Sequence, residues 1–158
     1  MKFTPIQETD LAFVNEVRNE CAEYLHDPRT FTLDQTKEWF KTGPKWWIIW
    51  HEGERIGYFR TSNYHEAFNR NTMYIGADLH KDYRGKGLAY EAYQKFIPIV
   101  SDQYKLWVIL LEVLATNTRA INLYGKLGFQ KSCGHIVRII NKKKVVSILM
   151  SMRPCDIH

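Results

Sequence analysis

Residues 73–89 read MYIGADLHKDYRGKGLA. The apolar first part predicts a buried strand, the basic middle part predicts a glycine-containing turn, and Leu88-Ala89 begin a helix. Glycines let a backbone approach a ligand closely, and the N–H groups and dipole of a helix N-terminus attract negative charge. The segment therefore predicts an anion-binding site between a strand and a helix.

A second segment, residues 117–129, reads NTRAINLYGKLGF and predicts a helix that Asn117 caps and Gly128 ends. Its apolar residues form one stripe along this helix: Ala120, Leu123, Tyr124 and Leu127. Between the two segments, residues 106–114 are almost continuously apolar, which is typical of a strand covered on both faces. The sequence thus predicts a strand, a glycine turn and a helix, followed by a second strand and a second helix.

The composition indicates a globular chain. With 158 residues, 45% hydrophobic and 25% charged, it suits a single domain over 1–158 with a sizeable core, and disorder is excluded. Cys21, Cys133 and Cys155 form no CxxC pair, so the sequence predicts neither a disulfide framework nor a metal site. The first residues lack an apolar signal core and no run approaches a membrane span, so we expect a cytoplasmic protein.

The net charge is +5, from 22 Lys and Arg against 17 Asp and Glu. Such a balance could steer nucleic acid, a membrane surface or a nucleotide-like cofactor to the protein. The densest basic run, Lys142–Lys144, lies between two strand-like segments and is typical of a solvated hairpin tip. We therefore expect no nucleic-acid and no membrane partner.

Alternating and amphipathic patterns predict seven strands and four helices. The strands are expected at residues 3–6, 46–50, 55–61, 72–79, 106–114, 132–140 and 145–152. The helices are expected after Thr9 or Asp10, after the capping box of residues 32–35, over 88–97 before Pro98, and after Asn117. Residues 62–71 are expected to form a long loop. The natural packing is a mixed α/β sheet with helices on both faces.

The glycine turn carries a family resemblance. Residues 84–89, Arg-Gly-Lys-Gly-Leu-Ala, match the motif Gln/Arg-x-x-Gly-x-Gly/Ala of the GNAT family of acetyl-CoA-dependent N-acetyltransferases, and residues 117–129 resemble its second conserved block. The resemblance implies the GNAT fold, a mostly antiparallel seven-stranded sheet that splays between the fourth and fifth strands. It also implies acetyl-CoA as cosubstrate, without a metal.

The resemblance implies where acetyl-CoA binds. Backbone N–H groups from Arg84 to Ala89 would hold the pyrophosphate, with charge from Arg84 and Lys86, and the pantetheine arm would pair with the fourth strand. The expected cofactor-binding residues are Ala77, Asp78, Leu79, Arg84, Gly85, Lys86, Gly87, Leu88, Ala89, Asn117 and Lys126. The backbone near Leu79 would polarise the thioester carbonyl. The structural alternatives are that Asn117 is only a helix cap and Arg84 only a surface charge.

Two residues are expected to be catalytic. Tyr124 lies where the family places the general acid that protonates the leaving CoA thiolate, although it could be only a core aromatic. Glu112 lies inside an apolar strand, where desolvation would raise its pKa and suit it to accept an ammonium proton. Its position is similar to that of the catalytic Glu of ribosomal-protein N-terminal acetyltransferases. The alternative is a structural carboxylate bound to backbone or to an arginine.

Other polar residues remain candidates. Asp78 and His80 are rival bases, a water relay is a third route, and His65 and Glu66 in the long loop could face substrate or solvent. In this fold, four arginines come from elements on the acceptor side, where they could hold a phosphate or carboxylate: Arg18, Arg29, Arg60 and Arg70.

The expected reaction is direct acetyl transfer to a primary amine in a ternary complex, by a monomer or homodimer. The segments 17–19, 39–40 and 56–60 resemble acetyltransferases of nucleotide-linked amino sugars, which favours a small-molecule acceptor. Leu111-Glu112-Val113 instead resembles enzymes that acetylate protein N-termini, so a peptide N-terminus stays open. A non-catalytic CoA-binding module is a further alternative, and a nucleic-acid binder is a weaker one.

Overall fold

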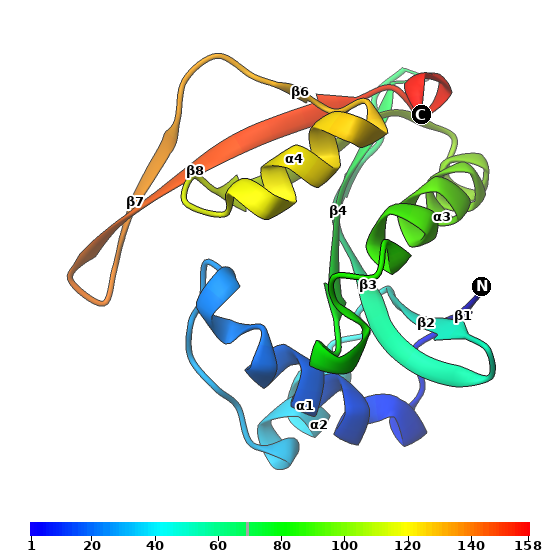
Figure 1. Ribbon diagram of the computed structural model, residues 1–158, viewed down its shortest axis with the longest axis vertical. Coiled ribbons are helices and arrows are strands. Elements are labelled where there is room, and N and C mark those ends of the chain that lie inside the picture. The colour runs from blue at the N-terminus through cyan, green and yellow to red at the C-terminus, as the bar shows by residue number, and fades with distance from the viewer. Residues whose placement is uncertain (69) are drawn as a thin grey trace.

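The structure is a computed structural model that describes residues 1–68 and 70–158. Its described residues form an eight-stranded sheet in the order β1-β2-β3-β4-β5-β8-β6, with β7 paired to β8. Neighbouring strands are antiparallel except for β4 and β5, which are parallel. Helices α1 and α2 lie on one side of the sheet and α3 and α4 on the other (Figure 1). The expected α/β class is confirmed.

The bounds of the elements are as follows. The strands are β1 Lys2–Pro5, β2 Trp46–His51, β3 Glu54–His65, β4 Asn71–Leu79, β5 Leu106–Leu114, β6 Gln130–Lys131, β7 Ile136–Ile140 and β8 Lys143–Met152. The helices are α1 Leu11–Glu20, α2 Leu33–Phe40, α3 Leu88–Tyr104 and α4 Thr118–Leu127. Among the described residues, no helix is long and apolar enough to cross a lipid bilayer.

The sheet opens between β4 and β5. The two strands pair only over the first part of β4, and their register ends where Tyr74 faces Leu110. Beyond that point, β4 pairs only with β3 and β5 only with β8. The predicted splay is therefore confirmed, and it leaves one edge of each strand free for a ligand.

Two apolar cores hold the layers together. On the α1 face, Val14 and Val17 pack with Tyr58 of β3, all three buried. On the other face, Phe96 of α3 stacks on Phe59 with ring centroids 4.0 Å apart. Because successive strand residues face opposite sides of a sheet, the neighbours Tyr58 and Phe59 serve both cores. The long apolar runs of the sequence thus reflect burial on both faces.

Two expected elements have other bounds in the structure. The third helix does not end before Pro98 but continues through it to Tyr104, because Val100 beyond the proline is also buried in the core. The stabilisation from burying this last turn offsets the loss of the one backbone hydrogen bond that the proline cannot donate. The sheet has eight strands instead of seven. Of the expected strand 132–140, only Ile136–Ile140 forms a strand, beyond Gly134, whose φ is 87°, and the additional strand, Gln130–Lys131, lies before the expected start. Strands β6 and β7 pair with different parts of β8.

The expected loop 62–71 is shorter than predicted. Strand β3 extends to His65 and β4 begins at Asn71, whose buried side chain donates to the carbonyl oxygen of Tyr104 at 3.0 Å. Asn69 lies outside the described residues. Asp10 does not cap α1 either, because its carboxylate accepts the N–H of Gln7 and pairs with Arg55. The capping box of Thr32 and Gln35 is confirmed.

Gly57 is a position where the packing between β3 and β4 requires the absence of a side chain. A Cβ there would run into the carbonyl oxygen of Asp78 and lie 2.7 Å from Cδ2 of Leu79. We expect Gly57→Ala to lower the free energy of unfolding by about 3 kcal/mol, as overpacking does. Gly125→Ala is the matched control, because open space surrounds Gly125 in α4 and alanine favours helix. Urea unfolding of both variants checks this, and an unchanged midpoint for Gly57→Ala would contradict it.

Candidate active site

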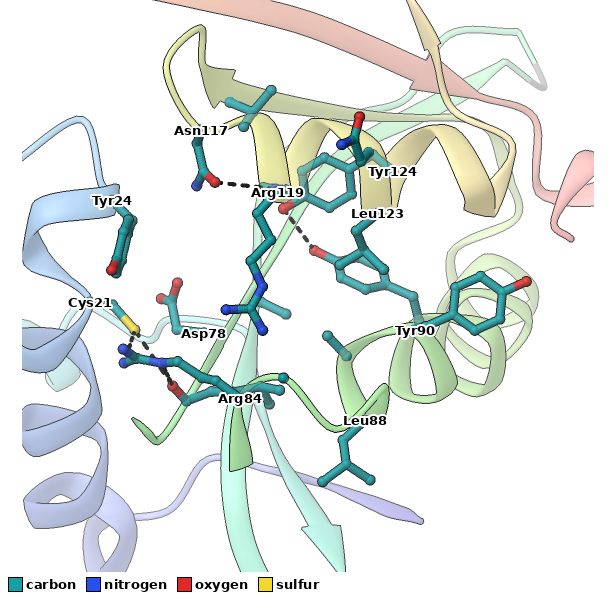
Figure 2. A pocket seen from close by; sticks show the side chains of 18 of the residues that line it. Cys21, Tyr24, Asp78, Arg84, Leu88, Tyr90, Asn117, Arg119, Leu123 and Tyr124 are labelled. Atoms are coloured by element: carbon teal, nitrogen blue, oxygen red, sulfur yellow. Dashed lines mark hydrogen bonds between the residues drawn. The ribbon is translucent and has the colours of Figure 1, made fainter. Parts of the chain in front are cut away.

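A cavity of about 810 Å³ lies at the splay. The end of β4, the start of α3, the first turns of α4 and the end of β5 surround it, together with the residues that follow α1 (Figure 2). It brings together every expected site residue except Lys86: Ala77, Asp78, Leu79, Arg84, Gly85, Gly87, Leu88, Ala89, Glu112, Asn117, Tyr124 and Lys126. Segments far apart in the sequence therefore meet at one place.

The glycine turn has the backbone that its sequence predicts. Gly85 and Gly87 adopt φ angles of 79° and 77°, in the left-handed region that favours glycine. Helix α3 begins directly after Gly87, and no described side chain caps its first turn. The N–H groups at this helix start are therefore free to bind an anion, and the helix dipole adds to the attraction.

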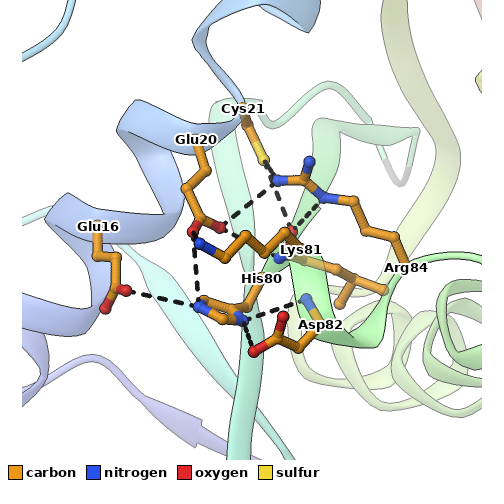
Figure 3. Close-up of polar contacts among 8 residues, drawn as sticks. Glu16, Glu20, Cys21, His80, Lys81, Asp82 and Arg84 are labelled. Atoms are coloured by element: carbon orange, nitrogen blue, oxygen red, sulfur yellow. Dashed lines mark hydrogen bonds and ion pairs between the residues drawn. The ribbon is translucent and has the colours of Figure 1, made fainter.

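The guanidinium of Arg84, which lines the cavity, is bound by groups of the protein itself. Its Nε donates to the carbonyl oxygen of Leu79 at 2.8 Å, its Nη2 lies 3.1 Å from the sulfur of Cys21, and Glu20 lies 3.8 Å away (Figure 3). Arg84 thus ties the end of β4 to the end of α1. Lys86 does not line the cavity, and its Nζ lies 5.7 Å from the ring centroid of Tyr83.

The cation beside the turn is Arg119, which sequence reasoning missed. Figure 2 shows its side chain reaching from α4 across the cavity towards the glycine turn. Its Nη2 lies 3.4 Å from where a Cβ of Gly85 would be. Among the described residues, Arg119 forms no ion pair with a carboxylate. The sequence did contain a signal for Arg119. It lies one helical turn before Leu123, which also lines the cavity, and residues four apart share one face of a helix.

The end of β4 presents backbone groups to the splay. The N–H of His80 donates to the carbonyl oxygen of Ile56 on β3 at 2.9 Å. Because N–H directions alternate along a strand, the N–H groups of Ala77 and Leu79 point the other way, where β5 has separated. These groups can pair with an extended chain lying in the splay, as the pantetheine arm was expected to do.

Asn117 and Cys21 contribute differently. The side-chain oxygen of Asn117 accepts the N–H of Ala120 at 3.1 Å, so Asn117 caps α4, and its NH₂ group is left to donate into the cavity. Burial and the Asp78 carboxylate raise the pKa of the Cys21 thiol to about 11. Cys21 therefore stays a neutral thiol and is no nucleophile at neutral pH.

Tyr124 lies in the cavity wall beside Tyr93. The hydroxyl of Tyr93, which is almost fully buried, donates to the hydroxyl of Tyr124 at 3.5 Å, and the rings pack edge to face. Burial raises the pKa of Tyr124, while the bond from Tyr93 and the charge of Arg60 lower it by less. Tyr124 therefore keeps its proton at neutral pH, as a proton donor must.

The expected raised pKa of Glu112 is wrong. Burial alone would raise the pKa of Glu112, but hydrogen bonds from Arg138 and Ser147 and the nearby His26 outweigh it, so the pKa lies below its ordinary value. The two guanidinium nitrogens of Arg138 contact both carboxylate oxygens. Arg138 lies on β7, and no local sequence pattern places it next to β5. Glu112 thus lines the cavity as a stable carboxylate, which is poorly suited to accept a proton.

Only one of the four candidate arginines, Arg60, lines the cavity. Its Nε lies 3.0 Å from Oδ2 of Asp78, which is 6% exposed, so each group has a partner. Arg18 donates to the carbonyl oxygen of Asp27 at 2.6 Å, and Arg29 pairs with the side chain of Asp27. Together with Arg70, they lie outside the cavity.

His80, a rival base, also lies outside the cavity. Its Nε2 is 3.5 Å from Glu16 and 3.6 Å from Glu20, and Asp82 approaches the other ring nitrogen (Figure 3). Glu16, Glu20 and His80 could in principle hold a cation, but Lys81 lies 3.4 Å from Glu20. The loop candidates His65 and Glu66 are exposed and do not line the cavity.

The segment after α1 completes the cavity and was not expected there. Tyr24, Leu25 and His26 line it opposite α4. Tyr24 belongs to a short 3₁₀ turn, Ala22–Tyr24, which is too brief to leave a periodic pattern in the sequence. Tyr24 lies close to the glycine turn as well, with its ring centroid 5.9 Å from Cζ of Arg84.

A splayed α/β sheet with a glycine turn at its opening suits an extended, anionic ligand. The profile of the acetyltransferase (GNAT) domain matches residues 1–130. The chain therefore belongs to the GNAT family and is an acetyl-CoA-dependent acyltransferase. A search of curated protein sequences finds no match.

Solved structures share the fold at low identity. A ribosomal-protein-alanine N-acetyltransferase from Brucella melitensis has a TM-score of 0.79 and 16% identity, over 97% of this chain and 99% of that chain. A spermidine N-acetyltransferase mutant from Vibrio cholerae has a TM-score of 0.82 and 17% identity, over 98% and 95%. A putative acetyltransferase from Salmonella typhimurium, solved with acetyl-CoA, has a TM-score of 0.77 and 18% identity, over 98% and 94%.

Proposed function

We propose that residues 1–158 act as one domain that transfers the acetyl group of acetyl-CoA directly to a primary amine. The observation that supports this most is that the free N–H groups after Gly87, the strand end at Leu79 and the phenol of Tyr124 line one cavity. The turn and Arg119 would hold the pyrophosphate, and the Leu79 backbone would bind the thioester arm. Acetyl-CoA supplies the activated acyl group when bound.

The reaction balances without a covalent enzyme intermediate. The amine lone pair forms a C–N bond with the carbonyl carbon as the C–S bond breaks, and Tyr124 gives its proton to the leaving thiolate. The ammonium form of the acceptor loses two protons in all. One replaces the proton that Tyr124 gave to sulfur, and the other goes to water.

For the acceptor, we propose a compact primary amine that enters beside Tyr24 and Glu112. A nucleotide-linked amino sugar stays a prediction. The four arginines expected to hold its phosphates give it no support, since three lie outside the cavity and Arg60 is already paired with Asp78. A peptide N-terminus is the second candidate. Relatives in fold include one named for spermidine and one for ribosomal-protein alanine, which makes both amine classes worth testing.

The test is CoA release from acetyl-CoA with a panel of amines: spermidine, an alanine-terminated peptide and a nucleotide-linked amino sugar. We expect turnover with at least one amine and a mass gain of one acetyl group on its nitrogen. Acetyl-CoA binding without turnover on any of them would favour the non-catalytic CoA-binding module instead.

Tyr93→Phe is expected to slow the reaction modestly. The Tyr93 hydroxyl lowers the pKa of Tyr124, so its loss raises that pKa further and makes Tyr124 a weaker acid. The loss of one hydrogen bond corresponds to a fall in kcat of about 3- to 10-fold. Because Tyr124 must be protonated to act, the alkaline fall in kcat should move to higher pH. An alkaline limb unchanged or moved to lower pH would contradict this.

A further inference from the structure

We propose that His26 accepts the proton that the acceptor ammonium loses to the enzyme, and that Glu112 holds the imidazole in place for this. The inference rests on the acetyl transfer proposed above and identifies the base of that reaction. His26 is then a catalytic residue, and Glu112 is a positioning residue.

The geometry places an imidazole and a carboxylate together in the cavity wall. His26 and Glu112 both line the cavity that contains Tyr124. Nε2 of His26 lies 3.2 Å from Oε1 of Glu112 and is buried, while 31% of the histidine side chain stays exposed. Nε2 makes no aligned hydrogen bond in the structure, so at this distance the Glu112 carboxylate acts on the imidazole through its charge, and a neutral imidazole keeps the lone pair of one ring nitrogen for the acceptor.

Glu112 is itself held as a carboxylate. Arg138 of β7 contacts both of its oxygens, and the hydroxyl of Ser147 on β8 donates to Oε1. These bonds fix the carboxylate and oppose its protonation, so Glu112 is better suited to orient a base than to be one. A carboxylate in this position also stabilises the imidazolium that forms when His26 takes a proton.

The charged groups that face His26 come from three strands: Glu112 on β5, Arg138 on β7 and Arg60 on β3. Burial lowers the pKa of His26, Glu112 raises it, and the two arginines lower it again, so the pKa lies below its ordinary value. His26 is therefore neutral at pH 7 and has a lone pair to accept a proton.

The proton path stays balanced. The acceptor ammonium gives one proton to His26, which passes it to water after the product leaves. The freed amine then attacks as described above, and its second proton restores the one that Tyr124 gives to sulfur. Neither an oxidant nor a further reactant is required.

The test compares pH profiles of kcat/KM for the wild type, His26→Gln, Glu112→Gln and the double variant, with the best amine of the panel. We expect His26→Gln to lower kcat/KM about 100-fold at pH 7, the lower range for general-base catalysis. The deficit should shrink as pH rises towards the pKa of the amine, because free amine then needs no base. Glu112→Gln should cost less, and the double variant should be no slower than His26→Gln. His65→Gln, at an exposed histidine outside the cavity, should match the wild type.

A wild-type rate and pH profile for His26→Gln would overturn the proposal. So would a large loss in Glu112→Gln with none in His26→Gln, since Glu112 would then be the base. Thermal midpoints establish that each variant is folded, and His26→Asn replaces His26→Gln if it is not. A proton NMR titration of the resting enzyme needs no acceptor: the pKa of His26 should lie below about 6.5 and fall further in Glu112→Gln. A pKa of His26 that stays the same in Glu112→Gln contradicts the role given to Glu112, whereas absence of wild-type turnover counts against the acetyl transfer itself.

Discussion

Tyr124→Phe is expected to lower kcat by about 100-fold or more, the range that a positioned general acid contributes. The substitution removes only the hydroxyl, so the ring should keep its edge-to-face packing against Tyr93 and Phe129. Tyr124 protonates the CoA thiolate during the chemical step and not during binding. The loss should therefore appear in kcat with saturating substrates and not in the affinity for acetyl-CoA. Steady-state kinetics with isothermal titration of acetyl-CoA separate the two.

The matched control for this prediction is Tyr64→Phe, which removes a hydroxyl from an exposed tyrosine outside the cavity. It should leave kcat unchanged. Unchanged turnover in Tyr124→Phe would show that Tyr124 is only a wall residue of the cavity.

Arg119→Ala is expected to weaken acetyl-CoA binding by about 10- to 100-fold, which corresponds to one or two charge-assisted hydrogen bonds. Arg119 lies beside Gly85 without a carboxylate partner among the described residues, so its charge is available to an anionic ligand. The difference from the wild type should narrow at high salt, because screening weakens partly exposed charge interactions.

Arg29→Ala provides the matched control, because Arg29 is exposed outside the cavity. It should bind acetyl-CoA as the wild type does. Titration calorimetry measures both variants. Equal affinities for Arg119→Ala and Arg29→Ala would show that Arg119 does not contact the cosubstrate.

The glycine turn and the helix after Asn117 could be predicted from sequence because their signals are local. Positive φ angles at Gly85 and Gly87 and the cap by Asn117 follow from residue types at fixed spacing. The splay between the fourth and fifth strands was expected from the family resemblance and not from the apolar patterns of the strands. The ends of helices and strands were harder to predict, because burial in the core decides them. Helix α3, for example, continues through Pro98 to Tyr104.

The electrostatic roles could not be predicted, because they depend on partners distant in sequence. Arg84 was expected to face the anion, but Leu79 and Cys21 hold its guanidinium. Glu112 was expected to have a raised pKa, but Arg138 approaches it across β8 and lowers that pKa instead. Hydrophobic patterns reveal which strands are buried, but they do not reveal which charges the pairing of β7 with β8 brings together.

The central claim is that the cavity at the splay binds acetyl-CoA for transfer. The most direct measurement is the thermal unfolding midpoint of the wild type as a function of acetyl-CoA concentration. A ligand that binds only the folded state stabilises it by about 2.7 kcal/mol at 100 times its dissociation constant, so we predict a midpoint that rises steadily with acetyl-CoA. A midpoint that does not move at millimolar acetyl-CoA would contradict the claim.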